Sequence, residues 1–172
     1  VNGSASLGTA VTLTTAANGL VGSAWNSAQI DLTKNFNMAF KVYFGAAGGA
    51  DGIDFVLQND SRGTAAQGGG GGGKGYTGIT PSMAFDLETY GSNGTLQALE
   101  NGSATNTCAY VAGTCPYVFP SNVANSAEHT YQVAWSASAK QLMLIVDGTV
   151  VMVYNRDLVA SVFGGASKVY YG

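Results

Sequence analysis

Apolar side chains alternate with polar or small ones along most of this chain, and that alternation restricts the fold more than any other feature. In FNMAFKVYF (36–44), every second residue is a large apolar one. Successive side chains of a β-strand point to opposite faces, so this period of two predicts a half-buried strand. TYQVAWS (130–136) repeats the pattern with Tyr131, Val133 and Trp135.

A hairpin is predicted near the C-terminal end, in QLMLIVDGTVVMVYN (141–155). Asp147-Gly148 lies between two apolar runs, and this dipeptide is a strong hairpin signal. Further short strands are expected in AVTLTT, QIDL, GIDFVLQ, SMAFDLETY and LQALE, whereas only NRDLVASVFG (155–164) favours a helical turn or two. Many short strands with Gly- and Asn-rich connections indicate an all-β sandwich or jelly roll, and 172 residues suit a single domain.

The low charge of the chain excludes some partners. Only 10% of the residues are charged, against about 25% in ordinary soluble domains, and the net charge is −3. Nucleic-acid binding requires a basic patch, which seven scattered Lys and Arg do not provide. No apolar run reaches the roughly 18–20 residues needed for membrane insertion. The composition suits an extracellular or cell-surface β protein, and the start at Val1 favours a fragment or module of a larger protein.

The two cysteines, Cys108 and Cys115, lie in TCAYVAGTCPYV. Zinc sites need two close pairs or added histidines, which this spacing lacks. A local disulfide is the favoured interpretation and two buried thiols are the alternative. A disulfide would indicate an oxidising location.

Six consecutive glycines, residues 68–73, are followed by Lys74 and Gly75. A phosphate-binding P-loop needs a Ser or Thr after the lysine and a helix thereafter, but Gly75 and a β pattern containing Pro81 follow here. The run also lies between two predicted strands of one domain, which argues against a flexible linker. The glycines therefore favour a backbone surface shaped for a ligand.

Five segments, in this order, resemble the L-type (legume-like) lectins in their bacterial surface-protein branch: GSAWNSAQIDLTKNFNMAFKVYFG, GADGIDFVLQND, GGGGKGYTGITPSMAFDLETY, HTYQVAWSASAKQLMLIVDG and DLVASVFGGASKVYYG. The resemblance covers most of the chain. It implies a concanavalin A-like jelly-roll sandwich with sugar bound at loops on one edge. The function that it implies is non-catalytic binding of cell-surface or polysaccharide glycans by an extracellular adhesin.

The resemblance also implies a sugar site. Asp51 matches the family's sugar-binding aspartate, whose peptide bond to the preceding residue is usually cis, and a carboxylate suits vicinal sugar hydroxyls. The alternative role of Asp51 is to cap a turn. Gly71 or Gly72 is expected to donate a backbone N–H to the same sugar, with Asn93 nearby. Tyr76 could stack on a sugar face, although a tyrosine at the start of a strand is more often a core residue.

The family's metal site is only partly matched. Asp86 and Glu88 stand where Glu and Asp are expected, with the two residues exchanged, and the carbonyl of Tyr90 and the side chain of Asn93 add oxygens. These groups offer four or five oxygen ligands for Ca²⁺. The segment that brings a second Asp and a His is absent, and the single histidine, His129, matches a different family position. A transition metal would therefore lack its imidazole ligand.

Two further interpretations stay open. Concanavalin-like sandwiches include glycoside hydrolases, and Asp86 and Glu88 on one strand face could form an acid pair. Tyr90 nevertheless occupies the third acidic position, Trp25 and Trp135 are expected in the core, and no catalytic residue is assigned. The second alternative is a structural module of a surface fibre or layer with decayed sugar binding. The sequence stops where the family continues into a closing strand, which predicts an open sheet edge for a neighbouring domain or subunit.

Overall fold

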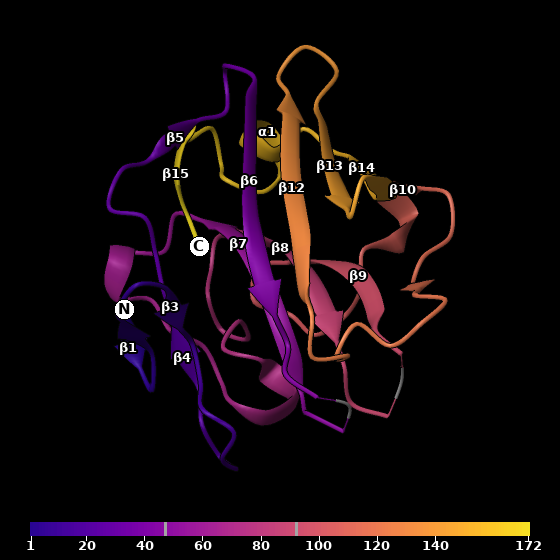
Figure 1. The fold of residues 1–172 in the computed structure, drawn as a ribbon. Helices are drawn as coiled ribbons and strands as arrows, with labels where there is room; N and C mark the ends of the chain where they lie inside the picture. The colour runs from indigo at the N-terminus through magenta and orange to yellow at the C-terminus, as the bar shows by residue number, and fades with distance from the viewer. Residues whose placement is uncertain (47, 92) are drawn as a thin grey trace.

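Two antiparallel sheets packed face to face form the body of the protein (Figure 1). The computed structural model describes residues 1–46, 48–91 and 93–172. The five-stranded sheet has the order β10 (Val111–Ala112), β14 (Thr149–Asn155), β13 (Gln141–Val146), β12 (Glu128–Ser136), β6 (Phe36–Tyr43). The six-stranded sheet has the order β11 (Tyr117–Val118), β9 (Thr95–Glu100), β8 (Ser82–Glu88), β7 (Gly52–Gln58), β15 (Lys168–Tyr171), β5 (Ile30–Asp31).

The remaining elements are short. The N-terminal region forms two two-stranded pairs, β1 (Asn2–Gly3) with β4 (Gly22–Ser23) and β2 (Ser6–Leu7) with β3 (Val11–Thr12). The helical elements are the 3-10 helices η1 (Gly63–Ala65), η2 (Gly71–Gly73) and η3 (Cys108–Tyr110), and the α-helix α1 (Leu158–Ser161). None of the described helices is long and apolar enough to cross a membrane.

The main core lies between the two sheets, where alternate residues of each strand meet. Phe40 of β6 and Phe55 of β7 stack across the interface with ring centroids 5.8 Å apart. The indole of Trp135 donates a hydrogen bond to the Leu32 carbonyl at 2.8 Å, so its polar atom is satisfied in the core. The core side chains of the longer strands include Leu57, Met83, Phe85, Leu87, Val133, Trp135, Leu142 and Leu144.

The opposite face of the six-stranded sheet is also covered, by the segment 59–78 between β7 and β8. There Val56, Tyr76, Ala84 and Leu99 form a second, smaller buried cluster. Because side chains alternate along a strand, the residues of β7 and β8 that do not face the main core face this segment instead. The segment contains the glycine run, so this second cover places the run directly over β7 and β8.

The structure confirms the predicted all-β sandwich and most of the predicted strands. The hairpin is β13–β14, with Asp147-Gly148 at its turn and positive φ at both residues. The predicted helical turn is α1, which begins where Asp157 accepts a hydrogen bond from the Ala160 amide. Cys108 and Cys115 form the expected disulfide, with Cα atoms 5.4 Å apart.

The expected open sheet edge does not involve the chain's last strand. β15 lies inside the six-stranded sheet, paired with β7 on one side and β5 on the other. Gly172 extends this pairing through two backbone hydrogen bonds with Val56. The long edge strand is β6, which among the described strands pairs only with β12.

Removing the disulfide by the double substitution Cys108→Ser/Cys115→Ser should lower the free energy of unfolding by about 2–3 kcal/mol, since the crosslink limits the freedom of the unfolded chain. For a domain of this size the melting temperature should fall by roughly 5–10 °C in calorimetry. Wild-type protein treated with a reductant is the control and should show the same loss. An unchanged melting temperature would contradict the expectation.

Candidate functional site

Asp51 is held at the point where the chain enters β7. The Ala50–Asp51 peptide bond is cis, as the resemblance implied. The carbonyl of Asp51 accepts hydrogen bonds from the amides of Thr89 at 2.8 Å and Tyr90 at 3.4 Å, just beyond the end of β8. These bonds fix the backbone of Asp51 and leave its carboxylate free to contact other groups.

The glycine run folds into a compact loop with hydrogen bonds of its own. The amides of Gly68 and Gly75 donate to the carbonyls of Gly75 and Gly69, at 2.7 and 2.8 Å. A Cβ at Gly68 would lie 2.5 Å from the backbone of Tyr76, so the chain passes too close there for any side chain. The loop is therefore an ordered structure rather than a tether.

Gly71 is the part of the loop that lies beside Asp51, and Gly72 follows it in the chain. Gly71 has a φ of +58°, and a Cβ built on it would lie 3.9 Å from Oδ2 of Asp51. A Cβ on Gly72 would meet no atom within 4 Å, so this glycine faces open space. Neither amide donates to another described residue. The structure thus places Gly71, one of the two backbone donors that the sequence assigned to the sugar, beside the Asp51 carboxylate.

The other two residues predicted for the sugar site lie elsewhere. Tyr76 is a core residue at 1% exposure, and its hydroxyl accepts hydrogen bonds from the Ser82 hydroxyl and the Gly102 amide. Its ring is therefore not available as a stacking surface. Asn93 lines a shallow, open depression together with Gly48, Thr89, Gly91 and Asn122. Thr89 connects this depression to Asp51 through the backbone hydrogen bond described above.

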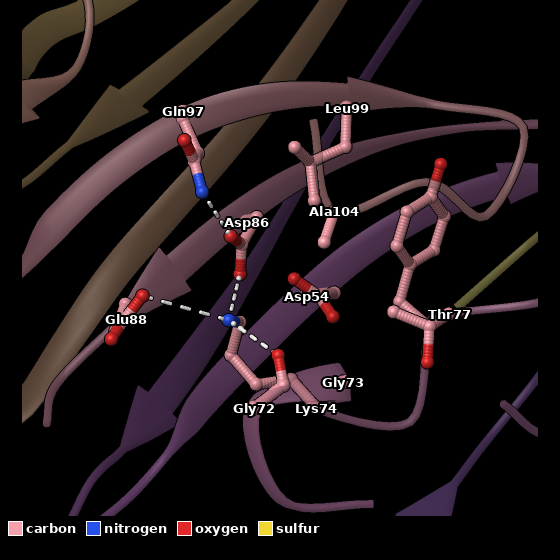
Figure 2. A pocket seen from close by; sticks show the side chains of 11 residues that line it. Asp54, Gly72, Gly73, Lys74, Thr77, Asp86, Glu88, Gln97, Leu99 and Ala104 are labelled. Atoms are coloured by element: carbon pink, nitrogen blue, oxygen red, sulfur yellow. Dashed lines mark hydrogen bonds and ion pairs between the residues drawn. The ribbon is translucent and has the colours of Figure 1, made fainter. Parts of the chain in front are cut away.

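Lys74, at the end of the glycine run, points under the loop toward the two carboxylates of β8 (Figure 2). Its Nζ lies 3.2 Å from Oδ1 of Asp86 and 3.8 Å from Oε2 of Glu88, and it donates to the Gly72 carbonyl at 3.1 Å. Gln97 of β9 donates to the other oxygen of Asp86 at 2.8 Å. The Lys74 side chain is only 6% exposed.

Asp54 completes this buried polar group. It is the cross-strand neighbour of Asp86 in the β7–β8 pairing, and neither of its carboxyl oxygens has a hydrogen-bond partner among the described residues. Burial, followed by the nearby Asp86, raises the pKa of Asp54 well above its ordinary value. A cavity of about 110 Å³, lined by Asp54, Lys74, Asp86 and Glu88 among others, lies beneath the loop. Its polar walls and size allow it to hold water.

The arrangement does not fit the calcium site that the resemblance implied. An ammonium already lies between Asp86 and Glu88, the two carboxylates expected to bind the metal. Asn93 lines the open depression and not the cavity that contains Asp86 and Glu88, and no cluster of three His, Cys, Asp or Glu in the described parts of the chain is placed to hold a metal ion. The side chain of Tyr90, whose carbonyl was the remaining predicted ligand, is exposed.

The geometry gives no support to the glycoside-hydrolase alternative. A hydrolytic pair must flank a bond of the substrate, whereas Asp86 is fully buried and paired with Lys74. Both tryptophan indoles donate to backbone carbonyls, Trp25 to Ala66 and Trp135 to Leu32. Trp25 is partly buried and Trp135 is buried, whereas a tryptophan that lines a substrate cleft must expose its ring.

Sequence reasoning missed the roles of Lys74 and Asp54. In the sequence, Lys74 is only a possible P-loop lysine, and Asp54 is only one residue of the predicted strand GIDFVLQ. A signal was present for Asp54: a carboxylate at a position between Ile53 and Phe55 of a predicted buried strand needs a partner. A lysine directly after six glycines gives no comparable signal, since its direction depends on the folded loop.

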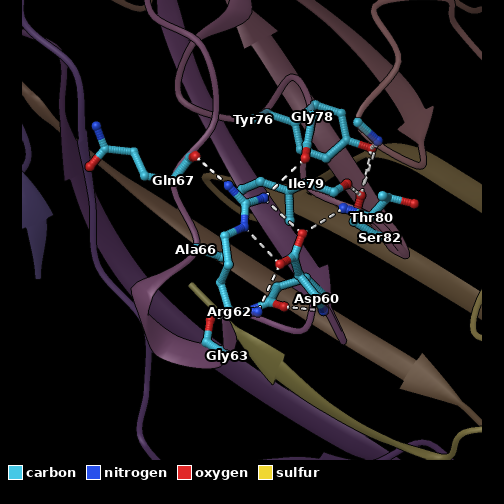
Figure 3. A network of polar contacts seen from close by, with 12 residues as sticks. Asp60, Arg62, Gly63, Ala66, Gln67, Tyr76, Gly78, Ile79, Thr80 and Ser82 are labelled. Carbon is cyan, nitrogen blue, oxygen red and sulfur yellow. Dashed lines mark hydrogen bonds and ion pairs between the residues drawn. The ribbon is translucent and has the colours of Figure 1, made fainter.

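The loop is clamped onto the sheet by Asp60 and Arg62 (Figure 3). The Asp60 carboxylate accepts hydrogen bonds from Arg62 Nε at 2.7 Å and from the Thr80 amide at 3.0 Å. Arg62 then donates to the carbonyls of Gln67 and Gly78, both at 3.0 Å, which are the two ends of the glycine loop. Hydrogen bonds from Arg62 hold the pKa of the Asp60 carboxyl well below its usual value.

Replacing Asp60 with Asn should destabilise the fold by about 2 kcal/mol, because the charge-assisted bonds to Arg62 are lost. A carboxyl whose pKa is depressed in the folded state stabilises the protein above its unfolded pKa of about 3.9 and loses this effect as the pH falls below it. The difference in unfolding free energy between wild type and Asp60→Asn, from urea titrations, should therefore begin to shrink below about pH 5 and continue to shrink as the pH falls toward the depressed folded-state pKa.

The control for this comparison is Glu128→Gln, which removes an exposed pair with Lys41 and should cost under about 1 kcal/mol at any pH. A pH-independent difference for Asp60→Asn would contradict the expected linkage.

No family model matches the sequence. Solved structures with a similar arrangement are lectins. Lectin I-B4 from Griffonia simplicifolia, in a metal-free form, aligns with a TM-score of 0.69 and 15% identity over 98% of this chain and 81% of that chain. Lectin UEA-II complexed with galactose aligns with a TM-score of 0.70 and 17% identity, over 99% of this chain and 80% of that chain. The Emp46p carbohydrate recognition domain aligns with a TM-score of 0.57 and 14% identity, over 86% of this chain and 66% of that chain.

At these identities the similarity concerns the arrangement of the backbone, and it extends over nearly the whole chain in the first two cases. The chain therefore has the fold of the legume lectins and of L-type lectin recognition domains, a concanavalin A-like jelly-roll sandwich.

Proposed function

We propose that this chain is a non-catalytic carbohydrate-binding module whose site lies where Asp51 meets the glycine loop. The observation that carries the proposal is that Gly71 lies beside the Asp51 carboxylate. The amides of Gly71 and Gly72 have no acceptor among the described residues. Asp51, Gly71 and Gly72 supply the acceptor and the donors, and Asn93 supplies an amide in the adjoining depression.

These groups match the chemistry of a sugar. A carboxylate accepts hydrogen bonds from two neighbouring hydroxyls of one ring, and such charge-assisted bonds are stronger than neutral ones. The amides of Gly71 and Gly72 donate to the same ring, because no side chain keeps it away from the backbone. Tyr90, with 67% exposure and an amide that contacts the Asp51 carbonyl, provides an aromatic surface in place of Tyr76. One lectin of the same fold was solved with galactose.

The proposed setting is an extracellular or cell-surface adhesin of the bacterial surface-protein kind, of which this domain is one module. The disulfide between Cys108 and Cys115 supports an oxidising location. The partners would be cell-surface or polysaccharide glycans. The low charge of the chain suits binding through hydrogen bonds to neutral sugars rather than through electrostatic attraction.

The Asp51→Asn substitution should reduce binding to any sugar found on a glycan array by at least tenfold, since an amide cannot accept two charge-assisted hydrogen bonds. The melting temperature should change little, because the structural contacts of Asp51 are made by its backbone carbonyl. Isothermal titration of the sugar would measure the loss, with Glu128→Gln as a surface control. Unchanged affinity in Asp51→Asn would show that the sugar binds elsewhere.

The Gly72→Leu substitution should weaken the same binding by at least tenfold by covering the backbone donors. The space around Gly72 is open, so the folded protein should tolerate the side chain with a melting temperature within about 3 °C of wild type. Gly8→Leu, in the turn between β2 and β3, is a matched control at a position where a Cβ also meets no close atom. Full binding by Gly72→Leu would exclude the loop from the sugar site.

One observation favours the second candidate, a structural module of a fibre or surface layer. The eight-residue edge strand β6 pairs only with β12 among the described strands, and its core-side residues Phe36, Met38 and Phe40 are only partly buried. Such an edge can accept a strand from a neighbouring domain or subunit. A folded protein that binds no glycan on the array and forms oligomers in sedimentation velocity would favour this candidate over the sugar-binding one.

A further inference from the structure

We propose that the ammonium of Lys74 is a built-in cation that joins the glycine loop to the carboxylates of β8, so that the ordering of this site is independent of divalent metal. The consequence for sugar binding rests on the function proposed above. The anchoring role itself does not, and it can be tested without any sugar.

The first support is the position of the ammonium. Lys74 follows the last glycine of the run, and its Nζ contacts three groups: the carboxylates of Asp86 and Glu88 on the sheet and the carbonyl of Gly72 on the loop. Gly72 is also one of the two residues whose amides are proposed to donate to the sugar. A single side chain thus connects the sheet to the part of the loop that carries the donors.

The second support is electrostatic. Lys74 and Asp86 are both buried, with side-chain exposures of 6% and 1%, and a buried charge is tolerated only when it is paired. The two carboxylates of β8 compensate the ammonium, and Gln97 binds the remaining oxygen of Asp86. A divalent cation between the same carboxylates would lie within a few ångströms of the ammonium and would be repelled by it.

The third support is steric, because the backbone is shaped to admit the lysine. Lys74 has a φ of +47°, in the left-handed region, where it ends η2 and its amide donates to the Gly71 carbonyl at 2.8 Å. This turn sends the side chain back under the loop. Gly52 of β7 lines its path: a Cβ there would lie 2.8 Å from Cδ of Lys74 and 2.0 Å from the Leu87 carbonyl oxygen.

The first experiment uses the wild-type protein and measures its metal content and thermal unfolding. Elemental analysis after purification without chelator should find no stoichiometric calcium. The melting temperature should differ by less than about 1 °C between EDTA and 1 mM CaCl₂. A calcium site of micromolar affinity would instead raise it by roughly 8 °C or more. Stoichiometric calcium, or a shift of that size, would overturn the proposal.

The second experiment replaces Lys74 with Met, which keeps the apolar stem and removes the charge. This leaves Asp86 and Glu88 without their cation, so the melting temperature should fall by roughly 5 °C or more. Lys41→Met is the matched control, because Lys41 pairs with Glu128 at the exposed surface and should shift the melting temperature by less than about 3 °C. Equal stability of Lys74→Met and wild type would overturn the proposal.

A double variant keeps the test decisive if Lys74→Met does not fold. Lys74→Met/Asp86→Asn removes both buried charges together and should fold, because no uncompensated carboxylate is left at Asp86. A double variant that is no more stable than Lys74→Met, or that also fails to fold, would contradict the anchor.

Sugar binding provides the last comparison. A sugar that binds the wild type should bind with unchanged affinity in EDTA. Loss of binding in EDTA would overturn the proposal, while a protein that binds no sugar but passes the two thermal tests would retain the anchor and lose only the proposed function.

Discussion

The burial of the central strands β7 and β8 of the six-stranded sheet on both faces is the constraint on which the rest of this structure depends. One face packs against the five-stranded sheet, and the other is covered by residues 59–78. A strand buried on both sides can no longer expose its polar residues to water, so every carboxylate on the loop side needs a partner or must be neutral. This requirement applies most strongly to Asp54 of β7 and Asp86 of β8, which are cross-strand neighbours.

The chain meets the requirement with groups from the covering segment itself. Lys74 comes from the glycine loop and pairs with Asp86 and Glu88, while burial favours the neutral form of Asp54. Arg62 acts similarly at the base of the loop, where Asp60 holds its guanidinium and it donates to the carbonyls on either side of the glycine run. Two cationic side chains, one inside and one at the base, thereby hold a loop that has almost no side chains of its own.

This arrangement connects the stability of the loop to its proposed use. Glycines expose backbone amides to a ligand but contribute no apolar contacts, so a glycine loop is ordered only if other groups hold it. Here the lysine supplies that support from beneath, and the outer surface at Gly71 and Gly72 remains open beside Asp51. The same loop can therefore be held rigid on its inner side while its outer side stays accessible to a ligand.

Local sequence information determined much of the fold. The period of two in residues 36–44 and 141–155, and the Asp147-Gly148 turn, are properties of neighbouring residues, and they predicted β6 and the β13–β14 hairpin correctly. The pairing of Cys108 with Cys115 also followed from two residues close in the sequence. The resemblance placed Asp51 beside the glycine run, and the structure brings Asp51 and Gly71 together.

Only the tertiary structure decided the direction of individual side chains. Tyr76 could have faced a sugar or the core, and the cover over Val56, Ala84 and Leu99 buries it. Lys74 could have extended into water, and Asp86 and Glu88 could have been placed to bind a metal ion. The outcome depends on how the loop folds back over β7 and β8. This is a long-range contact, and the local sequences of the segments do not show how close they lie in the fold. A local pattern specifies a strand, but the partner of a buried charge is set by the packing of the whole domain.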